Sequence, residues 1–161
     1  MNSNFVILLI LITFFILFLI IIFLLKRPRE GYVKVESIFT QPELKFYKIL
    51  FDCFPEYVIF GKVRVADIIN VDSRKAKGKY LKYFNKISRK HIDFLICDRE
   101  KFSPLVAIEL DDSTHEREER IERDKFLDKV FKMADLPLVR FKVKRNYNAE
   151  EIRRRIKDAM Q

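Results

Sequence analysis

The chain has 161 residues, 49% of them hydrophobic, and a formal net charge of +9, which suits one packed domain with an acidic partner. Two cysteines without C-x-x-C spacing exclude a disulfide framework and a cysteine-based zinc site, so Cys53 and Cys97 are interpreted as small core residues. The sequence has no internal repeat and no low-complexity tract, and the absence of an H-E-x-x-H pattern argues against a peptidase.

The apolar segment from Phe5 to Leu25 contains Thr13 as its only polar residue. As a helix it is about 32 Å long, which matches a hydrocarbon core of about 30 Å. A cleaved signal peptide is the alternative, but no basic region precedes the segment and no small-residue cleavage site comes after it. Basic residues at 26–29 favour the cytoplasmic side. We therefore expect a single-pass protein of the inner or plasma membrane with a cytoplasmic C-terminal domain.

The chain is thereby divided into three parts: an anchor at residues 1–29, a linker at 30–40 and a domain at 41–161. The first 25 residues carry no ionisable side chain, so the positive charge belongs entirely to residues 26–161. Such a charge indicates nucleic acid or the inner membrane surface as a partner. Solubility alone is the alternative explanation.

The domain is expected to begin with a helix over 41–53, for which Thr40 is the N-cap. Residues 57–69 predict a long strand, or a pair of strands broken near Gly61. The apolar residues of the first helix at helical spacing are Leu44, Tyr47 or Lys48, and Phe51.

A helix is expected over 75–87, within a stretch from Arg74 to Lys90 that has eight basic residues and no acid. Tyr80, Tyr83 and Phe84 are interleaved with these cations, as expected of a surface that follows a phosphate backbone. A solvated helix face is the alternative. The residues predicted to bind nucleic acid are Lys75, Lys79, Lys82, Lys86 and Arg89.

Two short apolar runs, 91–97 and 105–111, predict strands joined by a hairpin. Side chains alternate along a strand, so Glu109 and Asp111 share one face about 7 Å apart. In a hairpin Asp93 points to that same face. Carboxylates gathered at the end of an apolar strand are costly unless a cation or a proton joins them, and this geometry indicates a Mg²⁺ or Mn²⁺ site. Solvated edge residues are the alternative.

The remaining elements are an amphipathic helix at 116–134, a strand at 137–143 and a terminal helix at 149–160 capped by Asn148. The order of helix, three strands, helix, strand and helix defines an α/β domain. The predicted apolar stripe of the 116–134 helix consists of Ile121, Phe126, Val130 and Met133.

This order, with acids on the second and third strands, resembles the restriction-endonuclease-like fold of the PD-(D/E)xK nuclease superfamily. The resemblance implies an αβββαβ core preceded here by one transmembrane helix. Asp93 matches the first acid of that superfamily, and Glu109-Leu110-Asp111 matches its (D/E)-x-K element. Asp111 stands where the lysine is expected.

Residues 86–143 resemble more closely an uncharacterised bacterial family whose members often carry an N-terminal membrane span. They share the patterns I-S-x-K-H-x-D-F at 87–94, A-I-E-L-D-x-x-x-H at 107–115, E-R-D at 122–124 and P-L-x-R at 137–140. Similar strings occur in relatives of the very-short-patch-repair nicking endonucleases.

The resemblance implies a catalytic metal, Mg²⁺ or Mn²⁺, held by Asp93, Glu109 and Asp111. Glu43 resembles the auxiliary acid that many such nucleases place beside the metal. His115 is a candidate general base or a donor to the developing charge, with a helix cap or a surface histidine as the alternative.

Two lysines, Lys90 and Lys125, are candidates for the missing catalytic lysine, and Lys90 needs a bend in the incoming strand to reach the acids. Arg123 and Asp124 are interpreted as a structural pair that braces the site.

The leading hypothesis is a membrane-anchored, metal-dependent phosphodiesterase of the endonuclease type that acts on nucleic acid, DNA foremost, at the cytoplasmic face. The alternative is a non-catalytic domain of the same fold that binds nucleic acid or an anionic surface. Asp111 in place of lysine favours binding without cutting, so the sequence leaves open whether the protein is an enzyme.

Overall fold

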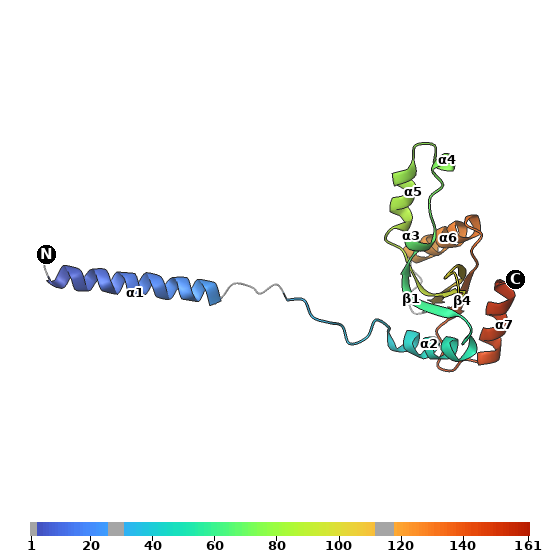
Figure 1. The fold of residues 1–161 in the computed structure, drawn as a ribbon, viewed down its shortest axis with the longest axis horizontal. Coiled ribbons are helices and arrows are strands. Elements are labelled where there is room, and N and C mark those ends of the chain that lie inside the picture. The colour runs from blue at the N-terminus through green and yellow to red at the C-terminus, as the bar shows by residue number, and fades with distance from the viewer. Residues whose placement is uncertain (1–2, 26–30, 112–117) are drawn as a thin grey trace. The chain divides into compact units, whose positions relative to one another are not determined.

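The computed structural model describes residues 3–25, 31–111 and 118–161, except the side chains of 118–121. The chain divides into two compact units, Met1–Glu36 and Ser37–Gln161. Figure 1 shows the helices and strands of both units.

The N-terminal unit contains one helix, α1 (Ser3–Leu25), which is long and apolar enough to cross a membrane. The Thr13 hydroxyl donates a hydrogen bond of 2.8 Å to the Ile10 carbonyl, one turn earlier. This bond satisfies the single polar side chain of the predicted span within the helix itself. A signal sequence near the N-terminus can meet the same criteria of length and composition, and the basic flank at 26–29 lies outside the described residues.

A four-stranded sheet forms the centre of the second unit, in the order β1-β2-β3-β4. The first three strands are antiparallel neighbours, whereas β3 and β4 are parallel. A parallel pair needs a crossover, and α6 (Glu118–Met133) lies between these two strands in the chain. The mixed α/β prediction is therefore confirmed. The strands are β1 (Val58–Arg64), β2 (His91–Cys97), β3 (Pro104–Asp111) and β4 (Leu138–Lys142).

One hydrophobic cluster packs the sheet against α2 (Gln41–Cys53) and α7 (Ala149–Ala159). Phe46 of α2 lies at its centre and is fully buried, with its ring centroid 5.1 to 5.9 Å from three other aromatic rings. Thr40 and Asn148 are the N-caps, as predicted, and the Asn148 side chain accepts two backbone N–H groups of α7. The rings around Phe46 belong to Phe94, Phe141 and Tyr147.

A second cluster packs Leu127 and Phe131 of α6 against Ile92, Leu95 and Cys97 of β2 and Ala107 of β3. Cys97 is buried in this cluster and Cys53 in the first, as expected of core residues. Burial raises the pKa of both thiols, so neither is an activated nucleophile.

Two predicted helix stripes were wrong in part, since Tyr47 of α2 and Phe126 and Val130 of α6 do pack against the core. In α2 the buried residues are Phe46, Leu50 and Cys53, whereas the predicted Phe51 is 61% exposed. In α6 the predicted Met133 is 76% exposed, and Leu127 and Phe131 are buried in its place. Both helices carry more apolar residues than one stripe holds, so spacing alone selected the wrong set.

The strand predicted at 57–69 ends at Arg64, and α3 (Val65–Ile68) follows it. Gly61 does not break the strand. A Cβ atom there would lie 2.3 Å from the Phe39 ring, so glycine lets this ring pack against β1.

The helix predicted at 75–87 is instead two helices, α4 (Ser73–Ala76) and α5 (Tyr80–Ile87). Lys77 and Gly78 between them have φ angles of 45° and 77°. This left-handed pair cannot continue a right-handed helix.

We expect Phe46→Ala to lower the free energy of unfolding by about 3–5 kcal/mol, because it leaves a cavity where three aromatic rings meet. Phe51→Ala, at an exposed position of the same helix, is the matched control and should cost far less. Urea unfolding of the full chain in a mild detergent, followed by circular dichroism, measures both. Equal losses would contradict the assigned core face of α2.

Candidate functional site

The ladder between β2 and β3 opens at Asp93. Its last described pair is Phe94 opposite Ile108, although both strands continue. Beyond it, the backbone N–H of Leu110 donates a hydrogen bond of 2.8 Å to Oδ2 of Asp93. The charge of Asp93 acts on Glu109, the residue before Leu110, so the two acids are close neighbours. The predicted meeting of these two acids on neighbouring strands is therefore found.

Four ionisable residues follow one another across the sheet at this level. The pairs Gly61–Phe94 and Val63–Ile92 place Lys62 opposite Asp93. On the other side, Glu109 pairs with Arg140 of β4. Two adjacent carboxylates are thus flanked by a cation on each outer strand, which offsets part of their mutual repulsion.

Among the described residues, Glu109 is the only charged residue that is buried, with 5% of its surface exposed. Its Oε1 atom is buried and has no hydrogen-bond partner in the described part of the chain. Burial, followed by the charge of Asp93, raises the pKa of Glu109 to about 8, against the opposing charges of Arg123 and Arg140. An uncompensated buried carboxylate of this kind is costly to keep ionised.

Lys62 connects α2 to the acid pair, a contact that the sequence analysis missed. Its Nζ atom lies 2.6 Å from Glu43 Oε1 and 3.1 Å from Asp93 Oδ1. Burial opposes the charged form of Lys62, but its hydrogen bonds to the two acids outweigh this effect and raise its pKa. Burial likewise acts against ionised Glu43, yet hydrogen bonds from Lys62 and the Thr40 backbone lower its pKa.

The backbone of Lys62 is unusual for a strand residue, with a φ angle of 57°. Non-glycine residues in the left-handed region are uncommon, and they concentrate at functional sites. Lys62 thus combines an uncommon backbone conformation with two ion pairs to acids.

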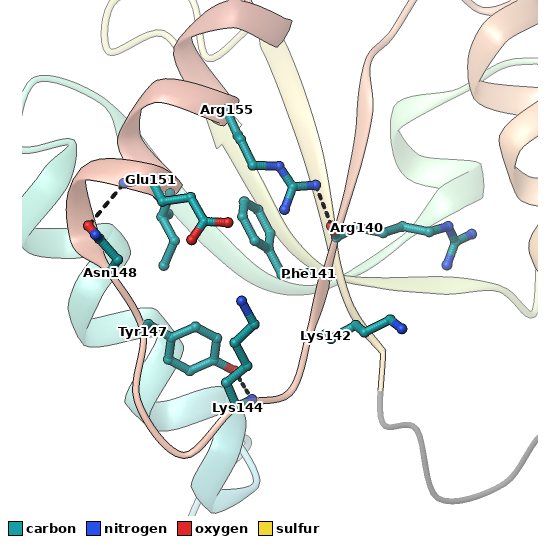
Figure 2. A pocket seen from close by; sticks show the side chains of 9 residues that line it. Arg140, Phe141, Lys142, Lys144, Tyr147, Asn148, Glu151 and Arg155 are labelled. Atoms are coloured by element: carbon teal, nitrogen blue, oxygen red, sulfur yellow. Dashed lines mark hydrogen bonds between the residues drawn. The ribbon is translucent and has the colours of Figure 1, made fainter.

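Arg140 gathers the acids on the α6 side of the site. Its guanidinium lies 3.3 Å from Asp111, 3.4 Å from Asp124 and 3.1 Å from Asp128. Figure 2 shows the Arg140 side chain extending away from α7, while its carbonyl accepts a hydrogen bond of 2.9 Å from Arg155.

Asp111 consequently lies beside Arg140, and not in a three-acid cluster. Among the residues that the structure describes, no three His, Cys, Asp or Glu side chains form a group able to hold a metal ion. Of the three predicted ligands, Asp93 and Glu109 come together, and Asp111 serves as an ion-pair partner in this arrangement.

The other predicted catalytic residues differ in placement. Lys90 lines a surface depression and has no ion pair with the acids in the described ranges. Lys125 is exposed on α6. His115 lies outside the described residues, so its role stays a prediction. The predicted pair of Arg123 and Asp124 forms at 3.4 Å.

The residues predicted to bind nucleic acid lie between β1 and β2, on a segment that we name the basic arm, residues 73–90. Figure 1 shows its helices α4 and α5 next to each other, with α5 near α3. A depression of about 520 Å³ separates the end of the basic arm from α6. Its lining residues are Asn85, Lys86, Arg89, Lys90, Glu122, Arg123 and Phe126.

A second cavity, of about 290 Å³, lies between β4 and α7 and is lined by none of the predicted site residues. Its wall includes the Phe141 ring, with the Arg155 guanidinium 4.3 Å from the ring centroid. Glu151 and Lys144 point into the same region in Figure 2, so acid and base offset each other there. This cavity is therefore not our candidate functional site.

The sequence alone could indicate the contact of Lys62 with Asp93 only if the register between their two strands were known. Lys62 belongs to a predicted strand, and it meets Asp93 only if that strand is antiparallel to the next one in one particular alignment. Arg140 was marked in the sequence by the P-L-x-R pattern, but its partner Asp128 belonged to no motif.

A comparison with protein-family models matches residues 35–160 to one family, described as protein of unknown function (DUF2726). No curated protein and no solved structure matches the chain significantly.

We expect Glu109→Gln to stabilise the protein at alkaline pH. Native Glu109 keeps its proton up to about pH 8, whereas its ordinary pKa is 4.5, so the native state binds more protons in this window. Stability should therefore fall as the pH rises from 4.5 towards 8. The variant should escape this loss and exceed the wild type by about 2–4 kcal/mol above pH 8.

Urea unfolding with a chelator at several pH values measures this difference, which should vanish near pH 4. Glu100→Gln, at an exposed hairpin position, is the control and should track the wild type throughout. If Glu109→Gln and the wild type were equally stable at every pH, the raised pKa of Glu109 would be contradicted.

Proposed function

The chain belongs to the DUF2726 family, whose function is unknown, and we propose that its domain is a metal-dependent phosphodiesterase that cuts nucleic acid, DNA foremost, at a membrane. The observation that carries this proposal is the Asp93–Glu109 pair at the open end of the β2–β3 ladder. The proposed fold is restriction-endonuclease-like, and the α2–β1–β2–β3–α6–β4 order agrees with the αβββαβ core of that fold.

The acid pair fits a hard divalent cation. Mg²⁺ usually keeps several waters and takes only one or two protein carboxylates, so Asp93 and Glu109 suffice without Asp111. The buried Oε1 atom of Glu109 has no partner in the described structure and is suited to a cation. A bound Mg²⁺ or Mn²⁺ would polarise the phosphoryl oxygen and lower the pKa of water.

Lys62 is our candidate for the cation that the resemblance places at position 111. Its ammonium lies 3.1 Å from Asp93, and Glu43 holds it from the other side at 2.6 Å. With 37% of its side chain exposed, Lys62 can donate to a phosphate oxygen of an approaching strand. Glu43 then acts as the auxiliary acid through Lys62, as a positioning residue.

The basic arm and the depression beside it would hold the sugar–phosphate backbone. Phosphate contacts supply most of the sequence-independent affinity for nucleic acid and weaken with salt. The depression joins the basic arm to Arg123, whose charge reaches Glu109. Arg123 thus links the proposed backbone-binding surface to Glu109, which is itself buried.

A second candidate is a non-catalytic domain that binds nucleic acid or an anionic surface. Asp111 favours it, because this residue replaces a lysine with an acid and pairs with Arg140. The lack of a three-ligand group among the described residues points the same way. The two candidates differ in whether a divalent ion binds at Asp93 and Glu109.

We place the protein in the inner or plasma membrane through α1, with the domain in the cytoplasm. The hydropathy of α1 supports the span, and the basic residues at 26–29 support the orientation. A cleaved signal sequence is the rival interpretation of the same helix.

We expect the full chain in mild detergent to cut plasmid DNA, linear DNA or single-stranded RNA with Mg²⁺ or Mn²⁺, but not with EDTA. Asp93→Asn and Glu109→Gln should each lower the rate by about 100-fold or more, since metal binding contributes several kcal/mol to such reactions. Lys62→Met should lower it by about 100-fold, as the loss of one donor to the transition state does.

Glu100→Gln is the matched control and should cut like the wild type. Mn²⁺ should also raise the melting temperature of the wild type and of Glu100→Gln, but not of the two site variants. Absence of cutting and of this stabilisation, with salt-sensitive DNA binding retained, would select the non-catalytic candidate.

We expect a reporter fused after Gln161 to be accessible only from the cytoplasm, because basic residues next to a membrane span favour the cytoplasmic side. Cysteine labelling in intact and in lysed cells measures this accessibility. The mass of the membrane-bound chain tests cleavage: an intact N-terminus supports the anchor. A reporter labelled in intact cells would contradict the orientation.

A further inference from the structure

We propose that the basic arm receives an unpaired strand of nucleic acid, an inference that rests on the proposed function and names its substrate class. Tyr80 and Tyr83 would stack on bases, and the lysines beside them would contact phosphates. The strand would then follow the depression between α5 and α6 towards Asp93 and Glu109.

The charge of the basic arm defines an anionic ligand. Residues 73–90 contain eight cations and no acid. Within the described structure the ion pair that involves them joins Arg74 to Asp72 at 3.6 Å, and Arg74 is almost fully exposed. Lys86 lies above the Phe126 ring instead, at 5.9 Å from its centroid. Most of this charge is therefore free to meet phosphates.

The exposed apolar side chains of α5 narrow the choice of ligand. Leu81 is 70% exposed, Tyr83 45% and Tyr80 41%. A duplex keeps its base faces inside the stack and offers phosphates and base edges, which do not use such rings. Unpaired bases expose their faces, and proteins bind them by combining aromatic platforms with a cationic groove.

The depression between the basic arm and α6 is lined mostly by cationic side chains. Lys86, Arg89 and Lys90 line one side of the depression, and Glu122, Arg123 and Phe126 of α6 line the other. At about 520 Å³ it has room for a backbone segment with a base. Lys90 directly precedes β2, and Asp93 is the third residue of that strand.

An anionic membrane surface would also attract lysines interleaved with tyrosine and leucine. It would use the exposed side of α5 alone and would leave the depression and its route to the acid pair without a role. The combined geometry therefore favours nucleic acid, and lipid binding becomes one outcome of the test.

The test measures binding of the full chain, in neutral detergent with EDTA, to a fluorescent single-stranded oligonucleotide and to the same strand annealed to its complement. We expect tighter binding of the single strand. Tyr83→Leu should weaken it at least about fivefold, because one base–aromatic stack contributes about 1–3 kcal/mol. Tyr83→Phe, which keeps the ring, should bind like the wild type, and neither variant should alter duplex binding.

Phe51→Leu is the control, because it removes an exposed ring from a helix outside the basic arm. Equal affinity for single strand and duplex, or no effect of Tyr83→Leu, would overturn the proposal. So would tight Tyr83-dependent binding to phosphatidylserine vesicles without single-strand binding. Cutting without single-strand preference would refute this inference alone. Single-strand preference without metal-dependent cutting would refute only the hydrolysis.

Discussion

The opening of the β2–β3 ladder at Asp93 is the constraint on which the candidate site depends. If the ladder continued, two carboxylates would stand directly opposite each other inside an apolar sheet, an arrangement that is unfavourable. The Asp93 carboxylate instead accepts the Leu110 N–H at 2.8 Å, so the backbone donor that the opening exposes is satisfied. Glu109 stays paired in the β3–β4 ladder, where its ionised form is destabilised. One of its oxygens is buried without a partner in the described structure, and its pKa is raised to about 8.

The neighbours of this pair limit how far the cost extends. Lys62 and Arg140, on the two outer strands, each carry their charge next to an acid of the pair, and each is engaged by further carboxylates. Asp93 therefore has a partner, whereas Glu109 interacts with Arg123 and Arg140 only through their field. The site is asymmetric as a result: one carboxylate is ion-paired, and the other is poised between its protonated and ionised forms. Such asymmetry between adjacent acids is typical of functional sites.

The sequence predicted the parts of this arrangement that local pattern determines. The bounds of the 41–53 helix and of the 91–97 strand were correct, and Asp93 and Glu109 do meet. It failed where tertiary packing decides: the buried face of α2, the split into α4 and α5, and the pairing of Asp111 with Arg140. Lys62 could not be found from spacing, because its contact with Asp93 depends on the register of two strands separated by the whole basic arm.

That separation is itself informative. Antiparallel neighbours such as β1 and β2 can be joined by a two-residue turn, yet residues 65–90 connect them through three helices. Sheet pairing does not require this connection, and its C-terminal half exposes Leu81 and Tyr83 to solvent at an energetic cost. The connection ends in Lys90, immediately before the strand that carries Asp93. A ligand bound along the basic arm would thus be positioned by the same strand that holds the first acid, and this rigid coupling is what a site needs in order to deliver a phosphodiester to its carboxylates.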